Sequence, residues 1–230
     1  VSIAGKSDDD FNFTTYPIEL RQKLFDGTIF ESFLVPSVIA WYKNRLLIGT
    51  GADEVRQKCR YGETLWHSFK MELGEDVGCT YPNSQLGKNH NLVEILTPKD
   101  ATELFFTFLK KQIDNYIKNN KLPQYLKCSV SVPASFEANQ RRDLLECMES
   151  AGFDVSTQAF IDEPNAAFLG YTLYSNKVNS PLNVPEDYFP NILVFDFGAG
   201  TCDLSILELG KDNKGIYSKN IAISRLKKLG

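Results

Sequence analysis

The sequence predicts an α/β protein in which a second, β-led unit begins late in the chain. Two strand–helix pairs follow one another between residues 125 and 174, which is the alternation typical of α/β folds. From Asn191 onward, three strand-like runs are joined by glycine-containing turns with no helix between them. We therefore expect one domain over residues 1–190 and the start of a second domain over residues 191–230.

In the first hundred residues, the predicted elements are short and are marked by their turns. The β-rich runs 33–42 and 46–48 are separated by a Lys-Asn pair, which predicts a hairpin. Asp53 is a candidate N-cap for a helix that would end near Arg60. Residues 74–92 contain many turn-forming residues and are expected to form loops.

The clearest helix is predicted to open at Thr97-Pro98. Apolar residues then recur at three- and four-residue steps as far as Ile117, which is the pattern of one buried helix face. Thr97 suits the N-cap, and proline suits the first turn because its missing N–H would have no helical partner there.

The rest of the chain supplies the alternation that defines the predicted class. Strands are expected at 125–132 and 155–161, and helices at 137–150 and 163–174, the first of them ending at an Ala-Gly pair. A long exposed loop is expected after the second helix, at 175–190. The three final strands are expected at 191–197, 204–209 and 216–224.

Composition excludes several classes of protein. The 230 residues are 43% hydrophobic and 23% charged, which is typical of an ordinary globular protein. A net charge of −4 does not suit a protein that binds a phosphate backbone, so no nucleic-acid partner is expected. No apolar run approaches the roughly 20 residues of a membrane helix, and no signal-peptide pattern is present, so neither a membrane partner nor secretion is expected.

The cysteines and histidines predict no transition-metal site. Five cysteines contain no C-x-x-C pair, and the two histidines have no ligand spacing with them. We expect free thiols and a cytoplasmic location.

The strongest chemical signal is a strand, a glycine turn and a second strand, with the sequence Val-Phe-Asp-Phe-Gly-Ala-Gly-Thr-Cys-Asp-Leu. Gly198 and Gly200 permit backbone angles that let successive N–H groups converge on an anion, and Thr201 adds a hydroxyl donor. Asp196 and Asp203 would repel a bare phosphate, so they indicate Mg²⁺ or a monovalent cation between carboxylates and phosphate. The structural alternative is a plain hairpin turn.

This motif resembles the second phosphate loop of the actin-like ATPase superfamily, and two further segments narrow the resemblance. Ile-Asp-Glu-Pro-Asn-Ala-Ala, from Ile161, and Val-Pro-Ala-Ser-Phe, from Val132, followed by Gln140-Arg141, resemble segments of the seventy-kilodalton heat-shock (DnaK-type) chaperones. Actin and sugar kinases lack this combination. The three motifs are about 30 residues apart and in the family's order, so the resemblance to that family's N-terminal ATPase domain covers about residues 30–230.

The resemblance implies a ribonuclease H-like, actin-like ATPase fold, with the first lobe at 1–190 and the beginning of the second lobe at 191–230. It implies ATP or ADP as ligand, Mg²⁺ as metal, and K⁺ as a further candidate cation. Co-chaperones and unfolded polypeptides would bind through domains outside this chain.

By the same resemblance, individual residues acquire roles in ATP hydrolysis. Asp196 would hold the water shell of the metal, and Thr201 would contact the terminal phosphate. Glu163 would orient water, and Lys70 would stabilise charge on the transferred phosphoryl group. The metal-side carboxylates would be Asp196, Asp203 and, through water, Glu163. The phosphate-binding residues would be Gly198, Ala199, Gly200, Thr201 and Cys202.

Each assignment has a simpler alternative. Glu163 also fits an ordinary first-turn glutamate stabilised by the helix dipole, and Lys70 a solvated surface lysine. Pro133 and Arg141 match the residues that relay nucleotide state in the family, but also fit a strand end and a helix-surface charge.

Departures from the family pattern leave alternative functions open. Ala199 replaces a glycine, and its methyl group is either tolerated at negative φ or crowds the phosphate. The family's first phosphate hairpin, Asp-x-Gly-Thr-Thr, would stand before Val1, so we expect these 230 residues alone to be inactive and the parent protein to be the ATPase. The alternatives are a non-hydrolysing scaffold or regulatory module of the same fold and, less favoured, a sugar kinase.

Overall fold

The chain forms two compact units in the computed structural model. Unit 1 comprises residues 1–127 and 139–154, and unit 2 comprises residues 128–138 and 155–230. Both units mix helices with small sheets, as the predicted α/β class requires. The structure describes residues 1–6, 13–74, 80–86, 94–124, 127–156, 159–177, 189–197, 201–213 and 215–227.

The central sheet of unit 1 is antiparallel and has the order β6-β5-β7. Lys43 and Asn44 join the first pair with φ of 50° and 57°, the left-handed conformations of a tight two-residue turn. The predicted hairpin is therefore confirmed, but its first strand begins later than residue 33, because Pro36 has no N–H for a ladder. The strands are β5 (Val38–Tyr42), β6 (Arg45–Ile48) and β7 (Leu65–His67).

Two further hairpins of unit 1 were not predicted from the sequence. In one of them, Gly27, with φ of 96°, lies in the turn, and the N–H of Leu24 donates to the carbonyl of Thr28 at 2.9 Å. These strands are short, and several of their residues are polar, so their alternation is weak. They are β1 (Ser2–Lys6) with β2 (Phe13–Pro17), and β3 (Leu20–Lys23) with β4 (Ile29–Ser32).

The first helix begins earlier than predicted. α1 covers Thr50–Glu54 and is followed by a 3-10 turn, η1, at Arg56–Lys58. Gly49 precedes it with φ of 81°, and its carbonyl accepts the N–H groups of the second and third residues beyond Thr50. Asp53 as N-cap is therefore wrong, because a glycine in a conformation rare for other residues already starts the helix.

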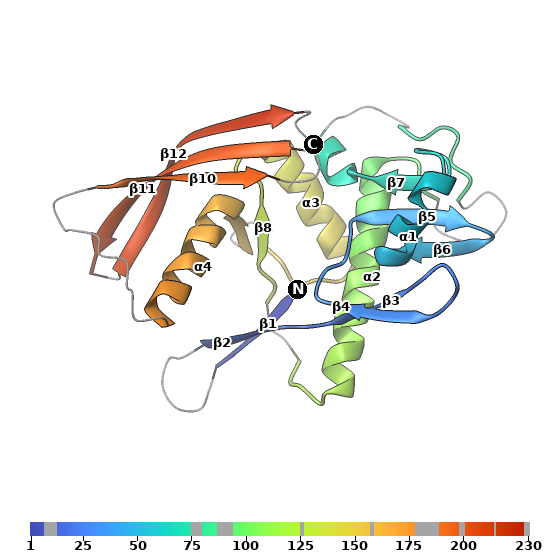
Figure 1. Cartoon of the computed structure of the whole chain (residues 1–230), viewed down its shortest axis with the longest axis horizontal. Helices are drawn as coiled ribbons and strands as arrows, with labels where there is room; N and C mark the ends of the chain where they lie inside the picture. Colours follow the sequence, from blue (N-terminus) through green and yellow to red (C-terminus); the bar gives the residue numbers. More distant parts are fainter. Residues whose placement is uncertain are drawn as a thin grey trace. The chain divides into compact units, whose positions relative to one another are not determined.

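The long helix of unit 1 confirms its sequence prediction. α2 covers Pro98–Asn119, with Thr97 as N-cap and proline in the first turn. Thr97 and Asp100 form a reciprocal capping box, in which each side chain accepts the other's backbone N–H. α2 runs alongside β5, β6 and β7 (Figure 1), and its apolar face joins their core. That core contains Ile39, Ile48, Trp66, Phe69, Tyr81, Leu86, Ile95, Ala101 and Phe105.

A second helix, α3 (Ala138–Ser150), also lies within one residue of its prediction. Gly152 follows it with φ of 85°, and its N–H donates to the carbonyl of Glu149 at 2.9 Å. This is the left-handed glycine ending that the Ala-Gly pair predicts.

Unit 2 contains the two strands that the sequence alternation predicts. β8 (Val130–Val132) pairs in parallel with β9 (Phe160–Asp162), and α3 is the connection between them. Both strands are shorter than predicted, and parts of the expected ranges lie outside the described residues. α4 (Glu163–Lys177) follows β9 directly, as predicted.

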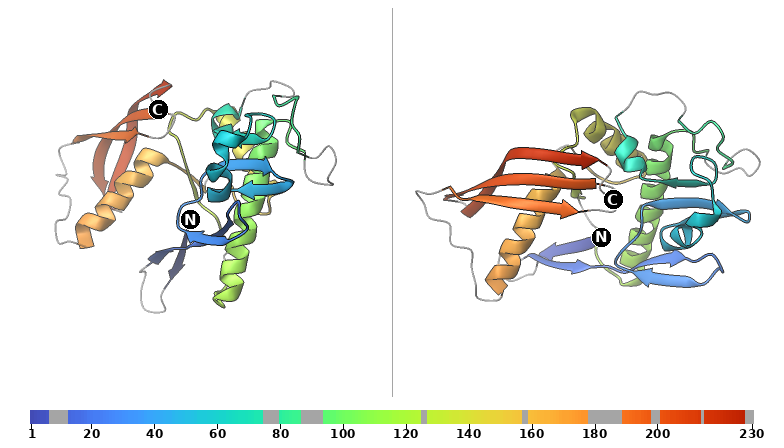
Figure 2. Two further views of the ribbon diagram at one scale, coloured as in Figure 1. Left: turned by 45° about the vertical axis from the view of Figure 1, so that its right-hand side comes forward. Right: turned by 45° about the horizontal axis from the view of Figure 1, so that its top comes forward.

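The last three predicted strands form one antiparallel sheet of order β10-β11-β12. One face packs on Phe168 of α4 through Leu207 and Leu209. α4 runs along this sheet in Figure 1 and in both views of Figure 2. β10 covers Asn191–Phe197, β11 Thr201–Asp212 and β12 Gly215–Lys227, the last two being longer than predicted.

Two other predictions concern loops and membrane helices. The predicted loop regions 74–92 and 175–190 lie largely outside the described residues, although α4 extends into the second of them as far as Lys177. Within the segments that the structure describes, no helix is both long and apolar enough to cross a bilayer.

Candidate functional site

Two carboxylates face each other across the first two strands of the unit 2 sheet. Asp196 of β10 is in register with Asp203 of β11, immediately before and after the predicted phosphate turn. Residues directly opposite in an antiparallel pair project from the same face, with Cβ atoms about 4.5–5.5 Å apart. On the other side of Asp203, β12 has Arg225 in register. The two facing carboxylates lie close to the predicted phosphate turn, where a cation would be stabilised between them.

Asp203 is also tied to a second predicted motif. The hydroxyl of Ser135 donates to a carboxylate oxygen of Asp203 at 3.3 Å. Ser135 lies in the Val-Pro-Ala-Ser-Phe segment, whose turn is closed by the N–H of Phe136 donating to the carbonyl of Pro133 at 3.0 Å. Two motifs that are 68 residues apart are therefore in direct contact. Ser135 is not among the site residues predicted from the sequence, although its hydroxyl lies inside one of the predicted motifs.

Glu163 occupies the corner between a strand and a helix. It is the first residue of α4, directly after β9, and its side chain is half-buried. The corner is fixed from β12, since Asn220 donates its amide to Asp162 at 2.7 Å, and Asn165 donates to the hydroxyl of Ser218 at 2.8 Å. The predicted strand-end position of Glu163 is therefore present, and it suits both a water-orienting carboxylate and a helix-terminal one.

The phosphate turn itself is only partly described. Gly198, Ala199 and Gly200 lie outside the described residues, as does the side chain of Thr201. Cys202 is 1% exposed and lies opposite Phe197, so its thiol is buried in the sheet. Any contact of Cys202 with a phosphate would therefore use its backbone N–H.

Lys70 belongs to unit 1, whereas the carboxylates above belong to unit 2. It lies on η2 (Phe69–Glu72), a 3-10 turn that follows β7, and it is half-buried. Phe69 anchors this turn in the core of unit 1. The predicted relay residues also divide between the units, with buried Pro133 after β8 in unit 2 and half-buried Arg141 on α3 in unit 1.

A hydrogen-bonded tyrosine pair holds the end of the turn that carries Lys70. The hydroxyls of Tyr61 and Tyr81 donate to the two carboxylate oxygens of Glu72, at 2.5 and 2.6 Å. Burial raises the pKa of Tyr61 to about 12, and the hydrogen bond to Glu72 adds to the rise. Burial, followed by the same carboxylate, also raises the pKa of Tyr81. Both tyrosines therefore remain donors to Glu72 at neutral pH.

The candidate metal ligands of this site are the carboxylate oxygens of Asp196 and Asp203. Among them, no three or more His, Cys, Asp or Glu side chains gather closely enough to hold a metal ion. The described cysteines, Cys59, Cys128, Cys147 and Cys202, are free thiols, as predicted. Two facing carboxylates fit a hard cation such as Mg²⁺, which takes one or two protein carboxylates and keeps several waters.

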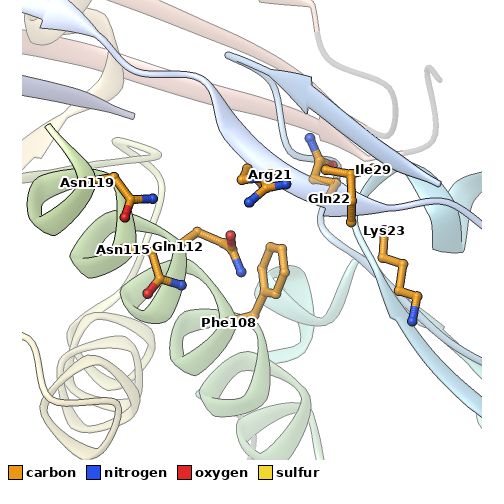
Figure 3. Close-up of a pocket in the computed structure, with 8 residues that line it drawn as sticks. All are labelled: Arg21, Gln22, Lys23, Ile29, Phe108, Gln112, Asn115 and Asn119. Atoms are coloured by element: carbon orange, nitrogen blue, oxygen red, sulfur yellow. The ribbon is translucent and has the colours of Figure 1, made fainter. Parts of the chain in front are cut away.

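A pocket of about 430 Å³ in unit 1 is lined by none of the predicted site residues (Figure 3). β3 lines one side and α2 the other, and Arg21 of β3 already pairs with Glu31 at 3.2 Å. The lining residues are Arg21, Gln22, Lys23, Ile29, Phe108, Gln112, Asn115 and Asn119.

Comparison with known proteins identifies one family. The family model described as "Hsp70 protein" matches residues 32–221, a range that contains every predicted site residue from Lys70 to Asp203. A curated relative, "Heat shock cognate HSP70 protein" of Trypanosoma brucei brucei, is 28% identical over 194 residues. The match covers 76% of this chain and 26% of the relative, so the chain spans about a quarter of the length of that protein.

Proposed function

The chain belongs to the Hsp70 family, and from this premise we propose that it binds ATP and ADP with Mg²⁺ and serves ATP hydrolysis in a molecular chaperone. The observation that carries the proposal is the pair Asp196 and Asp203, in register on either side of the glycine turn. The proposed fold is that of the actin-like ATPases, with the first lobe at 1–190 and the start of the second at 191–230.

In this proposal, the turn and its flanking strands bind the phosphates. Backbone N–H groups at Gly198, Ala199, Gly200 and Cys202 converge on phosphate oxygens, because such turns form anion-binding concavities. The hydroxyl of Thr201 donates to the terminal phosphate.

The carboxylates form the metal side of the proposed site. Asp196 and Asp203 hold Mg²⁺ through oxygen atoms or through its water shell, with K⁺ as a further candidate cation. The hydroxyl of Ser135 fixes the orientation of Asp203. When bound, Mg²⁺ neutralises charge on the phosphate oxygens.

Two residues act on the reacting groups. Glu163 accepts a hydrogen bond from the attacking water and aligns it, which a carboxylate at a fixed strand–helix corner can do. Lys70 stabilises the negative charge of the phosphoryl group as it is transferred. Pro133 and Arg141 are proposed to relay the nucleotide state to chaperone domains outside this chain, where co-chaperones and unfolded polypeptides would bind.

Ala199 favours a second candidate function. The family pattern has a glycine at this position, and a methyl group there would leave less room for backbone N–H groups to approach a phosphate closely. A protein that binds nucleotide weakly and does not hydrolyse it would serve as a scaffold or regulatory module of the same fold. We propose a cytoplasmic location for either function, since the described cysteines are free thiols.

Calorimetric titration of the full-length protein with Mg-ATP and Mg-ADP tests the proposal. We expect binding that is lost in the Asp196→Asn, Thr201→Ala double variant. Asp212→Asn is the matched control, because it makes the same chemical change at the far end of β11, opposite Gly215. Absence of nucleotide binding in the folded wild-type protein would overturn the proposal.

Phosphate release then distinguishes the candidate functions. Slow hydrolysis with water as acceptor supports the chaperone ATPase, whereas binding without phosphate release supports the scaffold. Turnover that requires an added sugar hydroxyl would indicate a kinase instead.

A further inference from the structure

Gly74 follows the turn that carries Lys70, and side chains of α3 bind both its N–H and its carbonyl. Its N–H donates to a carboxylate oxygen of Asp143 at 3.0 Å, and its carbonyl accepts the side-chain amide of Asn139 at 2.5 Å. Both partners lie in the first part of α3, 65 and 69 residues further along the chain. These two hydrogen bonds therefore hold the backbone after the Lys70 turn against α3.

The approach of this helix is so close that it requires glycine. Gly74 has φ of 83°, in the left-handed region. A Cβ atom there would lie 2.9 Å from the backbone nitrogen of Gln140 and 2.6 Å from its Cγ. A larger residue would push α3 away from the turn and break both hydrogen bonds.

Asp143 is a buried charge whose position packing alone does not explain. It is 6% exposed and lies on the buried face of α3, beside Leu144 and Cys147. A buried carboxylate is costly unless it is paired and hydrogen-bonded, and an apolar residue would fill the same place without that cost. Arg142 at 3.1 Å and Lys99 at 3.9 Å compensate the charge, and the Gly74 N–H uses the second oxygen.

The last residue of the turn, Glu72, is fixed by its two tyrosine partners, two residues before Gly74. η2 is four residues long, and so short a 3-10 segment has little stability of its own. Its geometry therefore depends on attachments to the rest of unit 1, which include Phe69 in the core, and the attachment at Gly74 leads to α3.

We propose that Asn139 and Asp143 are positioning residues that hold the η2 turn against α3 and thereby aim Lys70. The inference rests on the proposed function, in which Lys70 acts on the nucleotide phosphate. The proposed phosphate-binding and metal-binding residues, at 196–203, belong to unit 2, whereas the Gly74 attachment belongs to unit 1. We therefore expect loss of this attachment to affect the reaction step and to leave nucleotide binding intact.

The test measures kcat, KM and Mg-ADP affinity in the full-length protein. Asp143→Ala removes the acceptor of the Gly74 N–H, and we expect kcat to fall about 10- to 100-fold, as small displacements of a reacting group do, with Mg-ADP affinity unchanged. Asp143→Asn keeps an acceptor oxygen for the Gly74 N–H, so we expect its kcat to be close to that of the wild type and well above that of Asp143→Ala. Arg142→Gln is the matched control, because Arg142 pairs with Asp143 without bonding to Gly74.

A double-mutant cycle separates positioning from a general loss of structure. In a Lys70→Ala background, Asp143→Ala has no further effect on kcat, because there is no longer a lysine to aim. Asn139→Ala, which breaks only the bond to the Gly74 carbonyl, lowers kcat in the same direction and serves as the second variant if Asp143→Ala does not fold.

The outcomes of the proposed function and of this inference are distinguishable. If the wild-type protein does not hydrolyse ATP, the proposed function fails, and the positioning role falls with it. If the wild type is active and Lys70→Ala is not, but Asp143→Ala and Asn139→Ala keep the wild-type kcat, only the positioning role is overturned. A parallel loss of Mg-ADP affinity, or additive effects in the cycle, would also overturn it.

Discussion

Two glycines inside helices have opposite surroundings, and this predicts opposite effects of the same substitution. A Cβ at Gly51 of α1 would lie 2.0 Å from the carbonyl oxygen of Lys23 and 2.9 Å from the Cα of Leu24, backbone atoms that cannot rotate away. Nothing lies within 4 Å of a Cβ at Gly170 of α4. Gly51→Ala is therefore expected to destabilise the fold by about 1–3 kcal/mol, and Gly170→Ala to stabilise it by about 0.4–1 kcal/mol.

Urea unfolding of both variants measures these changes. Gly170→Ala serves as the control for the helix-propensity gain, which both substitutions share. A Gly51→Ala variant as stable as the wild type would show that α1 does not approach β3 as closely as the structure has it.

The tyrosine pair on Glu72 predicts a loss of stability at alkaline pH. Tyr61 has a pKa of about 12 in the fold against 10.0 ordinarily, so the unfolded chain releases this proton first as the pH rises. The stabilisation is complete below pH 10 and is lost as the pH rises toward 12. Glu72→Gln is expected to lower the pKa of Tyr61 without restoring the usual value, because burial remains its largest cause.

Absorbance titration of the phenolate checks this prediction. Subtracting the Tyr61→Phe titration from the wild-type titration isolates Tyr61 among the ten tyrosines. A Tyr61 titration near pH 10 in the wild type would contradict the partly buried, hydrogen-bonded arrangement of its hydroxyl.

At the scale of elements, the register of β10 and β11 predicts a conflict between stability and metal binding. Asp196 and Asp203 are directly opposite, and like charges in such pairs are destabilising. Without Mg²⁺ and nucleotide, Asp196→Asn is expected to stabilise the protein by about 0.2–1 kcal/mol. With saturating Mg-ADP, the order reverses, since only the wild type gains the full binding free energy.

Thermal unfolding with EDTA and then with Mg-ADP measures both effects. Asp212→Asn should leave the stabilisation by Mg-ADP unchanged, because Asp212 lies at the other end of β11 from Asp203. Equal stabilisation of Asp196→Asn and wild type by Mg-ADP would show that this carboxylate is not on the metal side of the site.

Elements were predictable where their signals are local. The Thr97 N-cap and the Lys43-Asn44 turn each depend on a few neighbouring residues, and the structure confirms both. The start of α1 was not predictable from Asp53. The N–H of Thr50, the first residue of α1, donates to the side chain of Gln22, 28 residues earlier in the chain. β1 to β4 were missed because short strands with polar residues give weak alternation.

The candidate site, too, was predictable only where its signals are local. The strand–turn–strand geometry around Asp196 and the corner at Glu163 follow from local sequence. The contacts of Ser135 with Asp203 and of Gly74 with Asp143 join residues nearly 70 positions apart, which no pattern within one element specifies. The position of Asp143 could have been noticed in the sequence, since a charged residue there falls on the apolar stripe of α3 beside Leu144 and Cys147.

At the scale of the whole molecule, one face of the unit 2 sheet carries exposed apolar side chains. The register places Leu193 opposite Ile206, and Phe195 opposite Leu204, all on the face directed away from Phe168 of α4. Leu193 and Phe195 are 64% and 62% exposed. Adjacent exposed apolar side chains of this kind form a hydrophobic patch that can bind apolar molecules.

Because that face is apolar and accessible, the 230-residue chain is expected to bind the dye ANS, with emission that falls in a Leu193→Ser, Phe195→Ser double variant. Unfolding by urea should change little, because neither side chain joins the core that Phe168 forms with Leu207 and Leu209. Leu169→Ser is the matched control, since Leu169 is an exposed leucine of α4 in the same unit. If Leu169→Ser lowers the emission as much as the double variant, the dye responds to scattered apolar residues and not to a continuous face of the sheet.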